Sequence, residues 1–280
     1  LLGLAATTVW LRQQGPITVA IGVDQPIVPG GVIDPSDKHA ADLFLVEHPR
    51  SPIRVVPLLN APDPATAPEG LRRLRQRGVA FVVNTHTSSH AVPSLPLFTD
   101  GGLLGMNVAS TSTRLSGRDD YLLRLVPDLA QEQRAMAGRS LAQFCGARQP
   151  GVPILLTPWG DGPAIHDAAG EARRQILQTR FRPPDLPGTA GAAYRQRFRQ
   201  RFGYEPTSMS LVSRQALELL EQAFAAGQRT PLEVKRWLLK QPVLRTSLGE
   251  VRFDRYGDVR GSYRFDALLP ELTNTTPQAG

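Results

Sequence analysis

The 280-residue chain has 41% hydrophobic and 20% charged residues, which is the balance of an ordinary globular protein with room for one large or two medium domains. Its formal net charge is +7, but the arginines are scattered and follow no aromatic-and-basic pattern or zinc-finger spacing. These features exclude the common nucleic-acid-binding classes, and the single cysteine, Cys145, excludes an intrachain disulfide.

The chain opens with an apolar run, residues 1–11, followed by Arg12 and two glutamines. The run is too short to span a bilayer as it stands. It predicts that residues 1–15 are the trailing part of an export signal or of an N-terminal membrane anchor. An ordinary N-terminal helix is the alternative. The expected location is periplasmic or otherwise extracytoplasmic, with membrane association through this segment.

Short apolar runs alternate with helical patterns along the first half of the chain. Strands are expected at residues 17–23, 53–58, 79–83, 103–106 and 121–126, and helices at 34–48, 68–77 and 91–100. This alternation predicts an α/β fold, in which parallel sheets are flanked by helices on both faces.

The second half is richer in helical patterns. Helices are expected at 127–144, 165–178, 189–202, 208–224 and 230–240, a strand at 152–157, an interdomain crossing at 182–185, and a β-hairpin at 249–268 that turns at 256–258. The hairpin prediction rests on alternating apolar and polar residues on either side of a Tyr-Gly-Asp turn.

Hydroxyl-rich turns follow two successive strands of the predicted sheet. Ser88 and Ser89 follow the strand at 79–83, and Ser110 and Thr111 follow the strand at 103–106. Ligands of open α/β sheets bind beyond the carboxyl ends of the strands, so these turns predict a polar ligand site. Helix capping is the alternative, but capping accounts for only one hydroxyl per turn.

The same turns offer little for catalysis or metal binding. His86 and His90 could share a metal ion, but no third ligand is evident, so neither a metal nor a cofactor is expected. Ser88 and a histidine could act as nucleophile and base, although no third group is visible to orient the base. Small hydroxyls with free backbone N–H groups suit a carboxylate, and carbonyls with a threonine hydroxyl suit an ammonium group. The pattern therefore favours a zwitterion such as an amino acid.

Three stretches together resemble a known family. They are VAFVVNTHTSSHAVPSLPLFTDGGLLGMNVAST (79–111), FRQRFGYEPTSMSLVSRQALELLEQA (198–223) and LGEVRFDRYGDVRGSYRF (248–265). In this order they resemble the branched-chain amino-acid (leucine/isoleucine/valine) substrate-binding proteins of ABC importers, which have the two-lobed type I periplasmic-binding fold. The resemblance implies that Ser88 contacts a ligand carboxylate, and that the Ala109 carbonyl and the Thr111 hydroxyl and N–H complete the first-lobe site. Ser89 and Ser110 are nearby second choices.

The resemblance also implies a division into lobes. Lobe I would comprise residues 16–126 and 186–247, lobe II residues 127–185 and 248–270, and residues 271–280 a tail. Only residues 128–151 lie where full-length members have several strand–helix units, so either the second lobe is reduced or a segment is absent. Trp159 is the candidate ligand contact in lobe II, with core packing as the alternative. The Tyr-Asp pair that is usual in the long helix is Arg214-Gln215 here.

The sequence thus predicts a non-catalytic solute-binding protein. It would capture a small polar ligand, an amino acid or a related amide, for the membrane subunits of an ABC importer. A membrane-tethered sensor or degenerate ectodomain without a transport role is the second hypothesis. A serine hydrolase that uses Ser88 and a histidine is the third.

Overall fold

The computed structural model describes residues 15–23, 35–134, 154–156, 176–180, 189–260 and 264–267. Predictions for the N-terminal apolar run, Cys145, Trp159, the crossing at 182–185 and the C-terminal tail fall outside these residues. In the part that is described, no helix is both long enough and apolar enough to cross a membrane.

A five-stranded parallel sheet is the largest sheet of the described residues. Its strands are β1 (Ile17–Val23), β2 (Ile53–Leu59), β3 (Phe81–Asn84), β4 (Leu104–Asn107) and β5 (Leu122–Arg124). They lie in the order β2-β1-β3-β4-β5, and every pair of neighbours is parallel. The predicted α/β fold class is confirmed, and all five strands lie within a few residues of the predicted runs.

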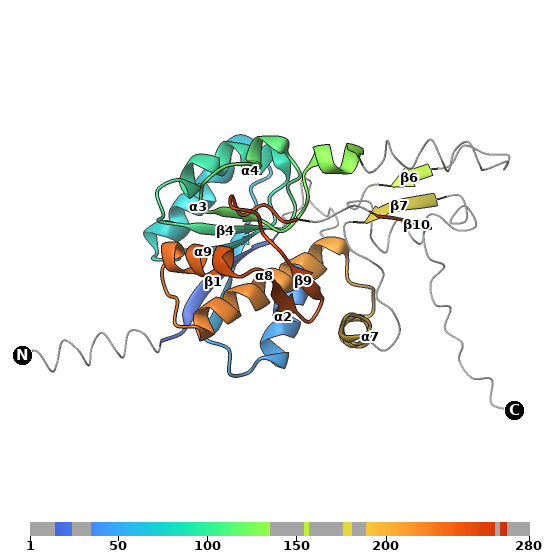
Figure 1. The fold of residues 1–280 in the computed structure, drawn as a ribbon. Helices are drawn as coiled ribbons and strands as arrows, with labels where there is room; N and C mark the ends of the chain where they lie inside the picture. Colours follow the sequence, from blue (N-terminus) through green and yellow to red (C-terminus); the bar gives the residue numbers. More distant parts are fainter. Residues whose placement is uncertain are drawn as a thin grey trace, which may run out of the picture.

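Helices cover both faces of this sheet (Figure 1). One face carries α3 (Ala67–Gln76) and α4 (Ser88–Ser94), and the other carries α2 (Ser36–Glu47), α8 (Ser208–Ala225) and α9 (Pro231–Lys240). A further helix, α7 (Ala190–Phe202), packs beside α2. The strands β3, β4 and β5 are buried on both sides, which explains why they appear in the sequence as short apolar runs, whereas the edge strand β2 is partly exposed.

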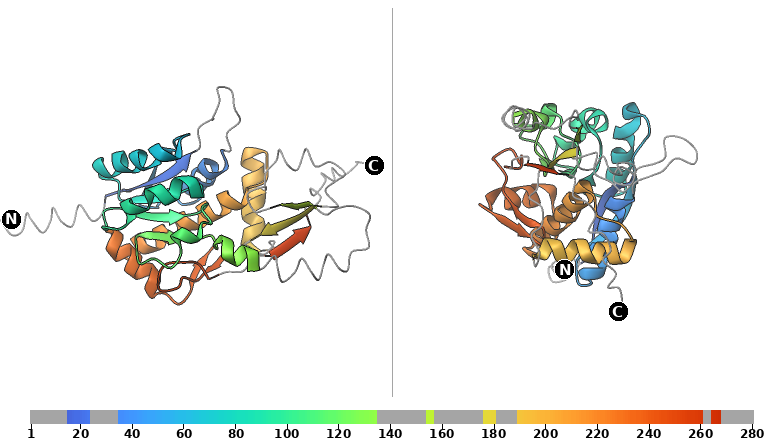
Figure 2. Two further views of the ribbon diagram at one scale, coloured as in Figure 1. Left: turned by 90° about the horizontal axis from the view of Figure 1, so that it is seen from above. Right: turned by 90° about the vertical axis from the view of Figure 1, so that its right-hand side faces the viewer.

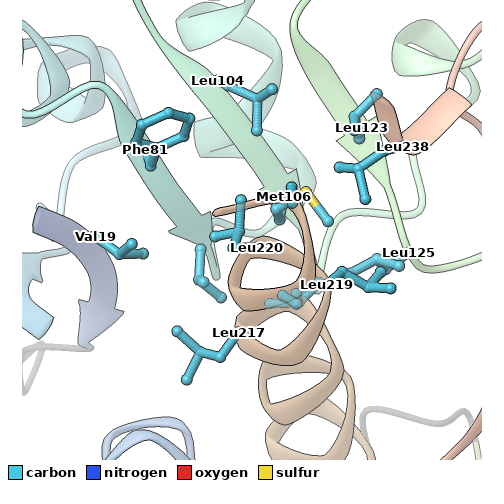
Figure 3. Packing of buried hydrophobic residues seen from close by; sticks show 14 of the residues in the cluster. Val19, Phe81, Leu104, Met106, Leu123, Leu125, Leu217, Leu219, Leu220 and Leu238 are labelled. Atoms are coloured by element: carbon cyan, nitrogen blue, oxygen red, sulfur yellow. The ribbon is translucent and has the colours of Figure 1, made fainter. Parts of the chain in front are cut away.

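The main core lies between the sheet and α8. Figure 3 shows Phe81, Leu104 and Met106 of the sheet facing Leu217 and Leu220 of α8, and all five side chains are buried. Each such side chain contributes about 1.5–3 kcal/mol on burial, so this layer anchors the strands whose ends carry the predicted site.

Arg214 of α8 is buried against α2, in place of the tyrosine expected from the family resemblance. Its guanidinium contacts Glu47 at 2.8 Å and Glu218 at 2.5 Å, and it donates to Nε2 of His48 at 2.9 Å. Because Nε2 accepts, Nδ1 of the neutral ring carries the proton and donates to Glu221 at 2.6 Å. The substitution thus brings a charge network that ties α2 to α8.

A smaller sheet lies beyond the carboxyl ends of the larger one (Figures 1 and 2). It consists of β6 (Ile154–Leu156), β7 (Ile176–Arg180) and β10 (Arg264–Ala267) in the order β10-β7-β6. β7 pairs with β6 in parallel and with β10 in antiparallel fashion. The prediction of a helix through residue 178 is therefore wrong at its end, because residues 176–178 already belong to a strand paired on both sides.

The predicted C-terminal hairpin forms next to its turn, where Phe253 and Val259 make an antiparallel bridge, but its outer strands have other partners. Asp254 N donates to Asp258 O at 2.8 Å, and Gly257 adopts the left-handed φ of 83° that the turn requires. However, β9 (Gly249–Val251) pairs with β8 (Leu244–Thr246), and β10 joins the smaller sheet. Sequence alternation indicates a strand but does not name its partner, which here depends on how the two sheets are connected.

Arg124 ties this turn to the end of β5. Its side chain is buried and bonded to Asp258, to the Tyr256 carbonyl at 3.0 Å and to Asp120 at 3.3 Å. Its backbone N–H donates to the Gly257 carbonyl at 2.8 Å. Burial raises the pKa of Asp120 above its ordinary value, against the attraction of Arg124. Arg124 thus links the end of β5 to the turn at residues 256–258, and both lie on segments that lead from the larger sheet toward the smaller one.

Candidate functional site

The two hydroxyl-rich turns meet at the carboxyl ends of β3 and β4. The last residues of these strands, Asn84 and Asn107, are register partners, so the turns that follow them start side by side. Ser110 in the second turn donates a hydrogen bond to Oγ of Ser88 in the first, across 3.0 Å. The arrangement brings the first-lobe candidates together at one edge of the sheet.

Several polar groups of this edge remain available. Ser88 accepts from Ser110, so its own proton can be donated elsewhere. Among the described residues, the Ala109 carbonyl and the Thr111 hydroxyl and N–H make no hydrogen bond. The Thr111 carbonyl accepts from Leu129 N at 2.7 Å, which links the site to the segment beyond β5. Ser88, Ala109 and Thr111 thus offer both donors and an acceptor to a polar molecule.

Ser89 has a different environment from Ser88. Nε2 of His90 lies 2.9 Å from the Ala61 carbonyl, which can only accept, so Nε2 carries the proton. Nδ1 of the same ring makes hydrogen bonds with the hydroxyls of Thr87 at 2.8 Å and Ser89 at 3.1 Å. Ser89 and His90 therefore brace the start of α4 against the loop that follows β2.

His86 is 2% exposed and lies beneath the first turn. Burial, with the neighbouring His90 imidazole as the second cause, lowers the pKa of His86 to about 4. The ring is therefore neutral at neutral pH, and its Nδ1 has no partner among the described residues. Ser88 is bonded to Ser110 and not to a histidine. In the described part of the chain, the hydrolase hypothesis thus lacks its nucleophile–base pair.

No metal centre is found in the part of the chain that the structure describes. The rings of His86 and His90 have centroids 5.8 Å apart, but no group of three histidine, cysteine or carboxylate side chains could hold an ion there. Trp159, the candidate contact from the second lobe, lies outside the described residues, so its role stays a prediction.

Sequence reasoning counted Asn107 only as one of the polar residues after its strand, and it missed Asn60 and Asn84, which also build this edge. Asn60 donates to Oγ1 of Thr85 at 2.9 Å, which joins the end of β2 to the end of β3. Gly22 of β1 lies between them, because a Cβ there would come within 1.9 Å of the same Oγ1. Asn84 and Asn107 each accept a backbone N–H from the turn that they begin. An asparagine at the last position of two successive strands is the signal that could have indicated them.

Comparisons with known proteins agree with the fold. A leucine binding protein of Thermotoga maritima superposes with a TM-score of 0.71 at 14% identity, over 90% of this chain and 95% of that one. A branched-chain amino-acid transporter substrate binding protein of Streptococcus pneumoniae, in complex with isoleucine, gives a TM-score of 0.67 at 15% identity, over 89% of this chain and 95% of that one. The chain has the type I periplasmic-binding fold.

In sequence, the chain is 33% identical over 103 residues to the Leu/Ile/Val-binding protein homolog 1 of Brucella abortus (strain 2308). The match covers 35% of this chain and 27% of that relative, so the chain matches about a quarter of the relative's length. No family model matches. The resemblance to the branched-chain amino-acid substrate-binding proteins is confirmed. The three proteins named above are all described as binding proteins, in agreement with the prediction of a non-catalytic protein.

Proposed function

We propose that the protein is an extracytoplasmic solute-binding protein that captures an amino acid or a related amide between two lobes for an ABC importer. The observation that carries the proposal is the joined pair of turns at the ends of β3 and β4. There the Ser88 hydroxyl is supported by Ser110 and keeps its own proton for a ligand.

The chemistry of the available groups matches a zwitterion. The Ser88 hydroxyl and the Thr111 hydroxyl and N–H are donors for a carboxylate. The Ala109 carbonyl is an acceptor for an ammonium group. Hydrogen bonds to charged groups contribute about 1.5–3 kcal/mol each, so two or three of them would supply a large part of a micromolar affinity of about 8 kcal/mol. Two similar structures hold isoleucine or leucine, which supports this class, whereas a third holds 3,4-dihydroxy benzoic acid, which shares only the carboxylate.

Lobe closure is the proposed mechanism. A ligand held by Ser88 and Thr111 would gain further contacts from the smaller sheet, which lies beyond the carboxyl ends of the larger one. Contacts made only in the closed form shift the population toward that form, and a membrane partner would then recognise it. Ser89 is assigned a supporting role, and Trp159 stays the candidate contact from the second lobe. In the alternative of a sensor ectodomain, the same closure would act on a signalling partner.

A binding panel tests this proposal. We expect calorimetry of the 280-residue chain to give micromolar dissociation constants, about 1–100 µM, for at least one of L-leucine, L-isoleucine, L-valine and their amides. Hydrolysis of the amides would favour the enzyme hypothesis, and the absence of binding across the panel would contradict the proposal. Binding without an interaction with importer subunits would favour the sensor.

A further inference from the structure

We infer that Asn107 is a positioning residue that fixes the loop of residues 108–111 and so sets which groups of that loop face the ligand. The inference rests on the proposed function for its meaning, because the loop is half of the proposed site. The sequence pattern includes Asn107 only among the polar residues after its strand, and the family resemblance gives it no role.

Three hydrogen bonds from one buried side chain hold the loop. Asn107 is 0% exposed, and its Oδ1 accepts from Ser110 N at 2.9 Å and from Ala109 N at 3.3 Å. Its Nδ2 donates to the Ser110 carbonyl at 2.7 Å. The amide therefore uses both its acceptor and its donor on the same two residues. This double use defines the turn more strictly than a single capping bond would.

The three hydrogen bonds of Asn107 determine which polar groups of the loop are left to bind a ligand. The N–H groups of Ala109 and Ser110 and the Ser110 carbonyl are occupied by Asn107. The Ala109 carbonyl and the N–H and hydroxyl of Thr111 are left available in the described structure. The same bonds set the direction of the Ser110 hydroxyl, which donates to Ser88. Asn107 thereby acts on Ser88 through Ser110.

Asn84, the register partner of Asn107, does not donate a hydrogen bond from its side-chain amide to its own turn. Its Oδ1 accepts from His86 N at 3.2 Å, but its Nδ2 has no partner among the described residues. The donor function is therefore specific to Asn107, and a substitution that removes only the donor will isolate it.

Asn107→Asp is such a substitution, because aspartate keeps the acceptor and the shape. When its new carboxyl group is neutral, it still supplies an O–H donor to the Ser110 carbonyl. When that group ionises, two oxygens face each other and the donor is lost. Burial at this position and the facing Ser110 carbonyl should raise the pKa of the new carboxyl group above its ordinary value of about 3.9, so that it ionises between about pH 5 and pH 8. We therefore expect L-isoleucine to bind N107D about tenfold more weakly at about pH 8 than at about pH 5, after correction for the wild-type profile. The matched control, Asn107→Ala, has no titrating group and should be weaker by a constant factor across this range.

A pH-independent affinity in N107D, or parallel profiles in N107D and N107A, would overturn the inference. If wild-type protein binds none of the panel, the proposed function fails, and the positioning role is tested without ligand. In ¹H–¹⁵N spectra of N107D, the Ser88 cross-peak should then titrate with the same midpoint as those of Ala109 and Ser110. If only the cross-peaks of Ala109 and Ser110 shift with pH and that of Ser88 does not, Asn107 acts only on its own turn, and the inference is overturned.

Discussion

The Ser110 hydroxyl donates to Oγ of Ser88 across 3.0 Å and joins two turns that are 22 residues apart in the chain. The bond exists because β3 and β4 are parallel neighbours, so their carboxyl ends lie at the same edge of the sheet. It gives the Ser88 hydroxyl a fixed acceptor role on one side and leaves its proton for a ligand on the other. The testable consequences start from this pair.

Removal of the Ser88 hydroxyl should weaken binding without unfolding the protein. We expect Ser88→Ala to raise the dissociation constant for L-isoleucine by about 10- to 100-fold, the effect of losing one hydrogen bond to a charged group. Thr99→Ala is the matched control, since Thr99 is exposed, precedes β4 at the opposite edge of the sheet and donates only to the nearby Pro96 carbonyl. Equal affinities in S88A and T99A would remove Ser88 from the site.

The hydroxyl of Thr111 can be tested separately from its backbone. Thr111→Val keeps the shape and the carbonyl that accepts from Leu129 N at 2.7 Å. We expect a loss of affinity for L-isoleucine of about tenfold and an unchanged thermal midpoint. Thr111→Ser restores the hydroxyl and should recover most of the affinity. A T111V protein that binds as tightly as wild type would mean that the ligand does not use this hydroxyl.

His86 makes the stability of the fold depend on pH. Its pKa is lowered from the ordinary value of 6.5 to about 4 in the folded protein, so between these values the unfolded chain binds one more proton. The stability that depends on a neutral His86 ring is fully present above pH 6.5, and it is lost as the pH falls toward 4. The loss is about 1.4 kcal/mol per pH unit, or about 3 kcal/mol in all.

Urea unfolding at several pH values measures this contribution. His86→Leu replaces the imidazole with an apolar side chain of similar size and so removes the titrating group. The difference in unfolding free energy between wild type and H86L should therefore slope with pH between 4 and 6.5 and flatten above this range. Parallel curves for the two proteins would show that another group causes the acid sensitivity.

Arg214 should be costly to replace alone. Arg214→Met removes the only cation paired with Glu218 among the described residues and leaves Glu47 with Arg197 alone, and we expect a loss of about 3–5 kcal/mol in unfolding free energy. Adding Glu218→Leu should recover part of this loss, because the double variant buries fewer unpaired charges. Arg72→Met, on the exposed side of α3, is the control and should change stability by less than about 0.5 kcal/mol. Additive losses in the double variant would contradict a coupled network.

Much of the larger lobe could be predicted because its signals are local. The β3 and β4 runs are free of polar residues up to a terminal asparagine, and polar turn residues follow, so both the strands and the site edge follow from the sequence. The pairing of Ser88 with Ser110 follows from strand adjacency, which the alternating pattern implies. The smaller sheet is different, because β7 lies where a helical pattern continues and its partner β10 is more than 80 residues away.

The roles of two buried polar residues could not be predicted from the sequence. Asn107 is an ordinary turn residue by composition, and only its three hydrogen bonds to Ala109 and Ser110 show its function. Arg214 was read only as a departure from the family pattern. Its burial between α2 and α8 depends on Glu47, which lies 167 positions earlier in the chain. Long-range pairs of this kind have no signature in either local segment.

The central claim is that Ser88 holds a ligand carboxylate, and the most direct test compares an acid with its amide. Wild-type protein and S88A are titrated by calorimetry with L-isoleucine and with L-isoleucinamide. We predict that the wild type prefers the acid by about tenfold or more and that S88A loses this preference, because the donor to the negative charge is gone. Equal binding of acid and amide by the wild type, or an unchanged preference in S88A, would contradict the account.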